Sequence, residues 1–153
     1  MVEYREGNLL DSDCNVICHQ VNCQGKMGAG IAFQIRKKWP KVYFWFNYVH
    51  TSGKAHLGKI DVIDVAEKKW VVNMYSQENY GRQPICYTDY DAFEDCLIAI
   101  KERFKNIPNL VIGFPNHIGC GLAGGDWDII KGLIEKHFNS DEWKVIIFRL
   151  EEK

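Results

Sequence analysis

The chain has 153 residues, and its shares of hydrophobic (46%) and charged (25%) side chains predict one soluble globular domain over residues 1–153. The formal net charge is −1 without a basic tail, which argues against non-specific binding along a polyphosphate chain. No segment reaches the length of a membrane span and the first residues lack the apolar run of a signal peptide, so we expect a cytoplasmic, monomeric protein without membrane contact.

Strands and helices alternate along the predicted chain. In chain order we expect strands at 2–6 and 15–21, a helix at 28–38, an aromatic-rich helix from 40 to 49, strands at 59–65 and 69–75, a polar loop at 76–84, a helix at 89–105 with Thr88 as N-cap, a strand at 110–114, a helix at 127–138 and a strand at 144–150. This alternation predicts an α/β fold, with a mixed, mostly parallel sheet covered by helices on both sides.

The first two helices carry unusual side chains. Residues 43–48 contain five aromatics, and helical spacing predicts that Trp45 and its neighbours pack in the core. All five cannot face inward, which leaves a weak self-association surface open as an alternative. The basic residues at 36–38 are interpreted as a solvated helix face.

Six cysteines occur without any secretory signal, so we expect them to be reduced. The cluster of Cys14, Cys18, His19 and Cys23 invites a zinc interpretation, but it lacks the paired CxxC spacing of structural zinc sites. We therefore predict neither a metal nor a cofactor.

Two glycine-rich loops, at 19–32 and 114–127, carry the strongest functional signal. Each follows a predicted buried strand and leads into a helix, an arrangement that presents free backbone N–H groups to an anion. Two such loops can hold a diphosphate from both sides. Neither has the GxxxxGK[ST] spacing of a Walker A loop or the third glycine of a dinucleotide fingerprint, which disfavours a kinase or a Rossmann dehydrogenase.

Four polar side chains in these loops have both a chemical and a structural interpretation. His19 is a candidate general acid–base or a buried core histidine, and Asn22 a ligand for a sugar diol or a turn residue. Asp126 is the natural N-cap of the following helix and a candidate catalytic carboxylate. Cys120 has no identifiable base beside it, so a nucleophilic role is disfavoured.

Several short strings in a fixed order complete the pattern: GNLL at 7–10, His19-x-x-Asn22, GAGIA at 28–32, NMYSQ at 73–77, GCGL at 119–122 and IFRL at 147–150. In these strings the sequence resembles the macrodomains, ADP-ribose-binding proteins with a three-layer α/β/α fold and a sheet of about six strands. It looks most similar to the branch that contains ADP-ribose-1″-phosphate phosphatases and terminal ADP-ribose glycohydrolases.

The resemblance assigns a role to each part of the pattern. It places Asn8 at the adenine amino group, Phe148 on the adenine face, one loop along the diphosphate and distal ribose, and the other as a second phosphate loop. Catalytic residues would be His19, Asn22 and Asp126. Ligand-binding residues would be Asn8, Leu9, Met27, Gly28, Ala29, Gly30, Ile31, Ser76, Gln77, Pro115, Ile118, Gly119, Cys120, Gly121, Leu122, Ala123, Phe148 and Leu150.

Two departures from the family pattern bear on the activity. Glycohydrolase members carry a lysine where this chain has Ser76 or Gln77, and an aspartate where it has Ala123. The resemblance therefore implies a metal-independent hydrolase that acts at the distal ribose of an ADP-ribose derivative, with ADP-ribose-1″-phosphate as the first substrate. The alternatives are a hydrolase of ADP-ribose attached to a protein or nucleobase, and a non-catalytic module that binds ADP-ribose or ADP-ribosylated macromolecules.

Overall fold

The computed structural model of the chain describes residues 1–150. Its elements are the strands β1 (Val2–Glu6), β2 (Val16–Asn22), β3 (Ile60–Ala66), β4 (Lys69–Gln77), β5 (Val111–Pro115) and β6 (Lys144–Arg149), the helices α1 (Gly30–Lys38), α2 (Pro40–Thr51), α3 (Tyr90–Phe104) and α4 (Trp127–Phe138), and a short 3₁₀ turn, η1 (Leu9–Asp11). The predicted strands and helices are therefore confirmed. The sequence analysis did not predict η1.

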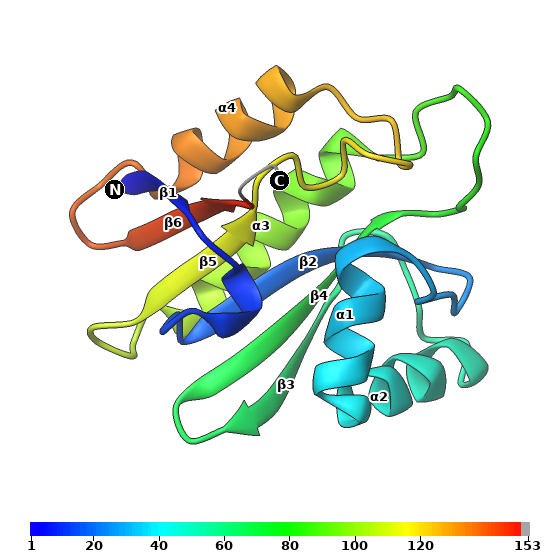
Figure 1. Cartoon of the computed structure of the whole chain (residues 1–153), viewed down its shortest axis with the longest axis horizontal. Coiled ribbons are helices and arrows are strands. Elements are labelled where there is room, and N and C mark those ends of the chain that lie inside the picture. Colours follow the sequence, from blue (N-terminus) through cyan, green and yellow to red (C-terminus); the bar gives the residue numbers. More distant parts are fainter. Residues whose placement is uncertain (151–153) are drawn as a thin grey trace.

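The six strands form one sheet in the order β1-β6-β5-β2-β4-β3. All neighbouring strands are parallel except β3 and β4, which form an antiparallel edge. As Figure 1 shows, α1 and α2 cover the β2–β4–β3 part of one face, and α3 and α4 lie on the opposite face. This confirms the predicted mixed sheet in a three-layer α/β/α arrangement.

The alternation of side chains along each strand explains the two core clusters. Val16 and Cys18 of β2 face α3 and α4, whereas Ile17 and Val21 face α1 and α2. Strands that are buried on both faces read as continuous apolar runs, which is why β2 was recognisable from its sequence. No helix within residues 1–150 is long and apolar enough to span a membrane.

Two sequence predictions about helices were wrong. The N-cap of α3 is Asp89, whose carboxylate accepts the Ala92 N–H at 2.9 Å, and Thr88 is instead used in the loop contacts described below. Trp45 is not a core residue, since its side chain is 48% exposed. Helix α2 meets the sheet through one narrow stripe of residues (Val42, Phe46 and Val49), which leaves most of its aromatic side chains outside.

Candidate functional site

The two glycine-rich loops leave the same edge of the sheet. β2 and β5 are parallel neighbours, so the loops that follow them start side by side at the carboxyl ends of these strands (Figure 1). The helices after β2 lie on one face of the sheet and the helix after β5 lies on the other. Such a change of face opens a crevice at the strand ends, which is where α/β sheets bind ligands.

The first loop ends in a helix N-terminus that no side chain caps. Ala29 is the N-cap of α1 and makes no side-chain hydrogen bond, so the first N–H groups of α1 remain available to an anion. Gly28 and Gly30 are exposed, and a Cβ built on either would meet no atom within 4 Å. Gly30 also has a φ of +58°, in the left-handed region that favours glycine.

Asn22 shapes this loop through its amide. Its Oδ1 accepts the N–H groups of Gln24 at 3.0 Å and Lys26 at 3.2 Å, and its Nδ2 donates to the Lys26 carbonyl at 2.8 Å. The side chain is buried. The structure thus gives Asn22 the role of a turn residue, which was one of its two interpretations.

The second loop combines packed and open glycines. A Cβ on Gly124 would lie 2.4 Å from the Ile85 carbonyl oxygen, and one on Gly125 would lie 2.6 Å from the Gly119 carbonyl oxygen. These two glycines are required by the fold. A Cβ on Gly121, in contrast, would meet nothing within 4 Å, so packing does not demand a glycine there.

A polar network that sequence analysis missed holds the second loop against the ends of β2 and β4. Gln20 Nε2 donates to Gln77 Oε1 at 2.8 Å and to Thr88 Oγ1 at 2.9 Å, and Gln20 Oε1 accepts the Ser76 hydroxyl at 2.7 Å. Thr88 Oγ1 in turn donates to the Gly119 carbonyl at 2.6 Å. Gln20 carried no sequence signal and Thr88 was predicted only as a helix N-cap, because the partners of both residues lie far away in the chain.

Two of the predicted ligand-binding side chains belong to this network. Ser76 is fully buried, and its hydroxyl is committed to Gln20. Gln77 is half-buried, and its Nε2 donates to the Asn79 carbonyl at 2.8 Å. Both side chains therefore position the loops in this structure.

His19 lies in the core beneath α1 and α2 and has no exposed surface. Its Nε2 is 2.6 Å from Asn73 Oδ1, and Asn73 Nδ2 donates to Asp61 Oδ2 at 3.3 Å. Tyr75 donates its hydroxyl to the same Asp61 oxygen at 2.6 Å. Since the Asn73 amide nitrogen is turned toward Asp61, its oxygen accepts the Nε2–H of a neutral His19.

Burial, opposed only by the hydrogen bond to Asn73, lowers the pKa of His19 to about 4. Nδ1 of His19 is the buried side-chain nitrogen or oxygen that has no hydrogen-bond partner within residues 1–150. A neutral ring sealed from the crevice has the properties of a core histidine, the structural interpretation of this residue. This placement argues against direct proton transfer by His19.

Asp126 and Cys120 lie close together at the second loop. Asp126 is exposed and caps α4 by accepting the Asp128 N–H at 2.9 Å, as the N-cap prediction required. Burial, and then the charges of Asp126 and Cys86, raise the pKa of Cys120 to about 11. A thiol that stays protonated is a poor nucleophile, whereas the Asp126 carboxylate is accessible to a bound molecule.

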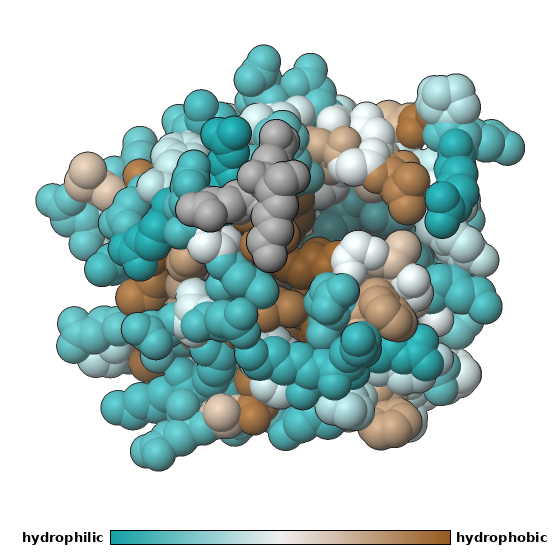
Figure 2. All heavy atoms as spheres, in the orientation of Figure 1, coloured by the Kyte–Doolittle hydropathy of each residue, from teal (hydrophilic) through white to brown (hydrophobic). Residues whose placement is uncertain are grey.

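Asn8 and Phe148, the two predicted adenine contacts, line the same cavity. This cavity has a volume of about 520 Å³ and extends from Gly7 past η1 to Val111 and Ile146. Figure 2 shows apolar side chains gathered near the middle of the face that Figure 1 presents. Leu150, the third residue predicted near the adenine, is 65% exposed.

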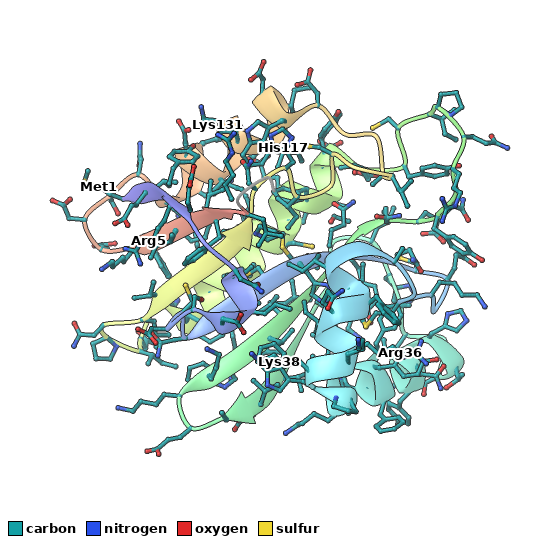
Figure 3. The ribbon with its side chains drawn as sticks, in the orientation of Figure 1. Met1, Arg5, Arg36, Lys38, His117 and Lys131 are labelled. Atoms are coloured by element: carbon teal, nitrogen blue, oxygen red, sulfur yellow. The ribbon has the colours of Figure 1, made fainter. Side chains whose placement is uncertain are left out.

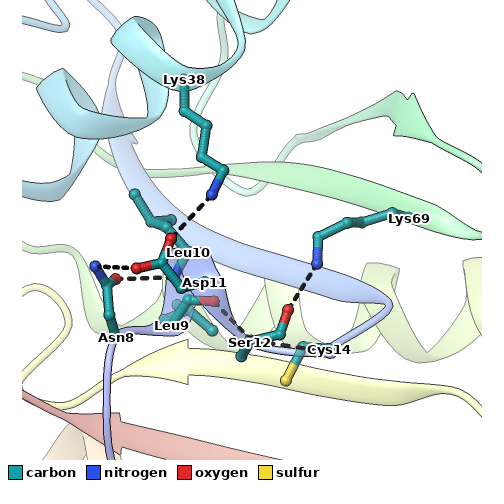
Figure 4. A network of polar contacts seen from close by, with 8 residues as sticks. All are labelled: Asn8, Leu9, Leu10, Asp11, Ser12, Cys14, Lys38 and Lys69. Atoms are coloured by element: carbon teal, nitrogen blue, oxygen red, sulfur yellow. Dashed lines mark hydrogen bonds and ion pairs between the residues drawn. The ribbon is translucent and has the colours of Figure 1, made fainter.

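Asn8 also organises the turn beside this cavity (Figure 4). Its Oδ1 accepts the Leu10 N–H at 3.0 Å, and its Nδ2 donates to Asp11 Oδ2 at 3.2 Å. Lys38 of α1 donates to the other Asp11 oxygen at 3.0 Å. One N–H of the Asn8 amide remains for a further acceptor.

The remaining predicted ligand-binding residues fall into three groups. Leu9, Met27 and Ile118 are buried; Ile31, Pro115, Gly119 and Ala123 are half-buried; Ala29 and Leu122 are exposed. A second hollow of about 320 Å³ lies between residues 82–86 and the Gly121–Leu122 part of the second loop. Arg82 on its rim is a charged side chain at the site that the sequence analysis did not single out. Residues 1–150 contain no group of three or more His, Cys, Asp or Glu side chains able to hold a metal ion.

No protein-family profile matches the chain. Its similarity to individual proteins is nevertheless clear. It is 28% identical over 143 residues to the DNA ADP-ribosyl glycohydrolase of Mycobacterium tuberculosis, and this alignment covers 90% of this chain and 39% of the relative. It is 24% identical over 152 residues to the human ADP-ribose glycohydrolase OARD1, and this alignment covers 97% of this chain and 91% of OARD1. The chain thus spans about two-fifths of the length of the mycobacterial relative.

Solved structures show the same similarity in three dimensions. A protein of unknown function from Bacteroides thetaiotaomicron superposes with a TM-score of 0.87 at 26% identity over 97% of both chains. The macrodomain of Mycobacterium tuberculosis DarG superposes with a TM-score of 0.83 at 23% identity, again over 97% of both chains. The protein has the macrodomain fold.

Proposed function

We propose that this macrodomain binds ADP-ribose in the crevice between the two glycine-rich loops and hydrolyses a bond at the distal ribose. The observation that carries the proposal is the set of three glycines, Gly28, Gly30 and Gly121, whose missing side chains would meet only open space. Together with the uncapped N-terminus of α1 they form a bare backbone surface suited to a diphosphate.

The nucleoside end of the ligand fits the cavity of Asn8 and Phe148. An aromatic face packs well against a purine, and a free amide N–H can donate to a purine ring nitrogen. The cavity volume of about 520 Å³ is within the range of small-molecule sites.

At the distal ribose, Asp126 is the strongest candidate for a catalytic residue. One of its oxygens caps α4, and the other remains able to accept a proton from an attacking water. His19 is buried and Ser76 is hydrogen-bonded to Gln20, so neither presents a reactive atom to the crevice. The loop N–H groups would stabilise negative charge on the leaving phosphate or diphosphate side.

An ADP-ribosyl group attached to a macromolecule is the first substrate class of this proposal. The relatives in Mycobacterium and human are named as ADP-ribosyl and ADP-ribose glycohydrolases, which supports this class. ADP-ribose-1″-phosphate is the second substrate. It is favoured by two departures from the family pattern: Ser76 or Gln77 stands where glycohydrolase members carry a lysine, and Ala123 stands where they carry an aspartate.

Titration calorimetry with ADP-ribose on Gly121→Val tests binding. The valine has room in the free protein, so the melting temperature should change little, while ADP-ribose affinity should fall at least tenfold because the side chain fills the space reserved for the ligand. The matched control is Gly132→Val on α4, a glycine with equally open surroundings. Equal affinity in both variants would refute the proposed binding site.

Catalysis is tested by Asp126→Asn, which retains the oxygen that caps α4. Release of ADP-ribose from a conjugate and of phosphate from ADP-ribose-1″-phosphate should both be measured, and the active assay should lose about 10²–10⁴-fold in kcat. Asp128→Asn, two residues further on in the first turn of α4, is the control. Full ADP-ribose binding without turnover of either substrate by the wild-type protein would identify a non-catalytic reader instead.

A further inference from the structure

The charged residues of this macrodomain are strongly segregated along the chain. Residues 14–60 contain no aspartate or glutamate, although they include seven of the 19 basic residues. The rest of the chain therefore holds 12 basic and 20 acidic side chains. Four of these seven basic residues, Arg36, Lys37, Lys38 and Lys41, lie on α1 and α2, so much of the excess positive charge belongs to one helical layer. A net charge of −1 conceals this asymmetry.

The same layer exposes large aromatic side chains. Phe33 on α1 is 40% exposed, and Phe44, Trp45 and Tyr48 on α2 are 68%, 48% and 53% exposed. Their spacing on α2 places them on one face with Lys41, beside the stripe that packs on the sheet. The rings of Trp45 and Tyr48 have centroids 5.5 Å apart and form an exposed pair. We call these four aromatics, with Arg36, Lys37 and Lys41, the α1–α2 surface.

Basic and aromatic side chains are interleaved on this surface. The Arg36 guanidinium lies 3.7 Å from the centre of the Tyr43 ring, which joins α1 to α2, and Lys37 lies 5.6 Å from the Phe33 ring. Arg36 and Lys38 lie on the opposite side of the molecule from Lys131 and His117 (Figure 3). Lys38 is paired with Asp11 and is left out of the surface. Lys37 and Lys41 make no ion pair within residues 1–150, so their charges are free for a partner.

The α1–α2 surface adjoins the first glycine-rich loop at both of its ends. α1 begins at Gly30 in the loop itself, and Phe33 follows within one turn. At the end of α2, His50 packs so closely on Gly25 that a Cβ there would lie 2.6 Å from its ring. A chain that lies on this surface would therefore be led to the crevice.

We propose that the α1–α2 surface binds single-stranded nucleic acid. Unstacked bases can lie on exposed aromatic rings, while lysine and arginine meet the phosphates, and both kinds of group are present here in alternation. A duplex hides the faces of its bases, and an acidic peptide would use the cations without the rings. A bound strand could present an ADP-ribosylated nucleotide to the crevice, and this part of the inference rests on the proposed function. Binding of an unmodified strand does not depend on the proposed function.

Fluorescence anisotropy with a labelled single-stranded DNA of mixed sequence tests the proposal. The wild-type protein should bind it with an affinity that falls steeply with salt. Trp45→Ala/Tyr48→Ala should weaken binding at least tenfold, and Trp45→Phe/Tyr48→Phe should restore most of it because phenylalanine still stacks. Lys37→Glu/Lys41→Glu should weaken binding at least tenfold and flatten the salt dependence.

The matched control for charge is Arg103→Glu/Lys105→Glu at the exposed end of α3, in the opposite helical layer. It makes the same change in net charge and should leave DNA affinity within twofold. Calorimetry with free ADP-ribose should give unchanged affinity in every variant. If the wild-type protein bound DNA but not ADP-ribose, the proposed function would be refuted and this inference would stand.

Four outcomes would overturn the inference, and three of them concern DNA binding. These are the absence of DNA binding by the wild-type protein, an equal loss in the α3 control, and equal affinity for a duplex of the same sequence. Binding of a polyglutamate peptide that is weakened by the same aromatic substitutions would assign the surface to a protein partner instead.

Discussion

Replacement of His19 by glutamine is expected to reduce the pH dependence of the stability of this macrodomain. In the folded protein, burial lowers the pKa of His19 to about 4, against 6.5 for an unperturbed histidine. As the pH falls below 6.5, the unfolded chain binds a proton that the folded protein excludes. The stability that His19 contributes is therefore fully present above pH 6.5 and is lost as the pH falls toward 4.

The size of the effect follows from the difference between the two pKa values. Each unit corresponds to about 1.4 kcal/mol, so the full difference corresponds to roughly 3 kcal/mol, of which about 2 kcal/mol is lost between about pH 7.5 and about pH 5. With a urea slope of about 2 kcal/mol per molar, this share lowers the unfolding midpoint by about 1 M. Glutamine can keep the hydrogen bond to Asn73 but cannot take up the proton.

Urea unfolding at these two pH values, followed by fluorescence of the five tryptophans, measures the effect. The drop in unfolding free energy should be about 2 kcal/mol smaller in His19→Gln than in the wild-type protein. His56→Gln, at an exposed position, should behave like the wild type. If His19→Gln and the wild type lost the same free energy, His19 would titrate normally in the folded protein, and the argument that it is sealed from the crevice would fail.

Three further predictions concern packing, capping and thiol chemistry. Gly113→Ala should destabilise the protein by about 1–3 kcal/mol, because the new Cβ would lie 2.4 Å from Leu9. Gly132→Ala, in open space on α4, should raise the melting temperature. Equal melting temperatures of the two variants would contradict this prediction. Asp89→Ala should cost about 1 kcal/mol in urea unfolding through the lost cap of α3, and an unchanged midpoint would count against it. At about pH 8, iodoacetamide should alkylate Cys120 about a hundredfold more slowly in the folded protein than in the unfolded chain, since the pKa of Cys120 is raised to about 11. Peptide mass spectrometry measures both rates, and similar rates would show an accessible thiolate.

Local patterns in the sequence were sufficient for most of the fold. The apolar run that became β2 and the helical period of α3 depend on neighbours within a few residues, and so does the Asp126 cap. The orientation of α2 could not be predicted in the same way. With aromatics on every side of the helix, periodicity did not distinguish the buried Phe46 from the exposed Trp45.

The candidate site divides along the same line. Both glycine-rich loops were recognisable because glycines after a strand and before a helix have a local meaning. The sequence did not distinguish the packed Gly124 from the open Gly121, since the difference is the Ile85 carbonyl oxygen that lies against Gly124. The network of Gln20 and Thr88 was likewise invisible, because the two residues are 68 positions apart.

The sequence by itself determined the order of strands and helices, the two glycine-rich loops and the absence of acidic residues over 14–60, because each of these depends on residue types and short spacings. The tertiary structure decided which side chains the crevice can use. His19 and Asn22 each had a catalytic and a structural interpretation from the sequence, and β4 and the 22–26 turn supply the hydrogen-bond partners that support the structural one. Burial and partnership are set by segments that are distant in the chain, and they decide whether a polar group holds the fold or meets a ligand.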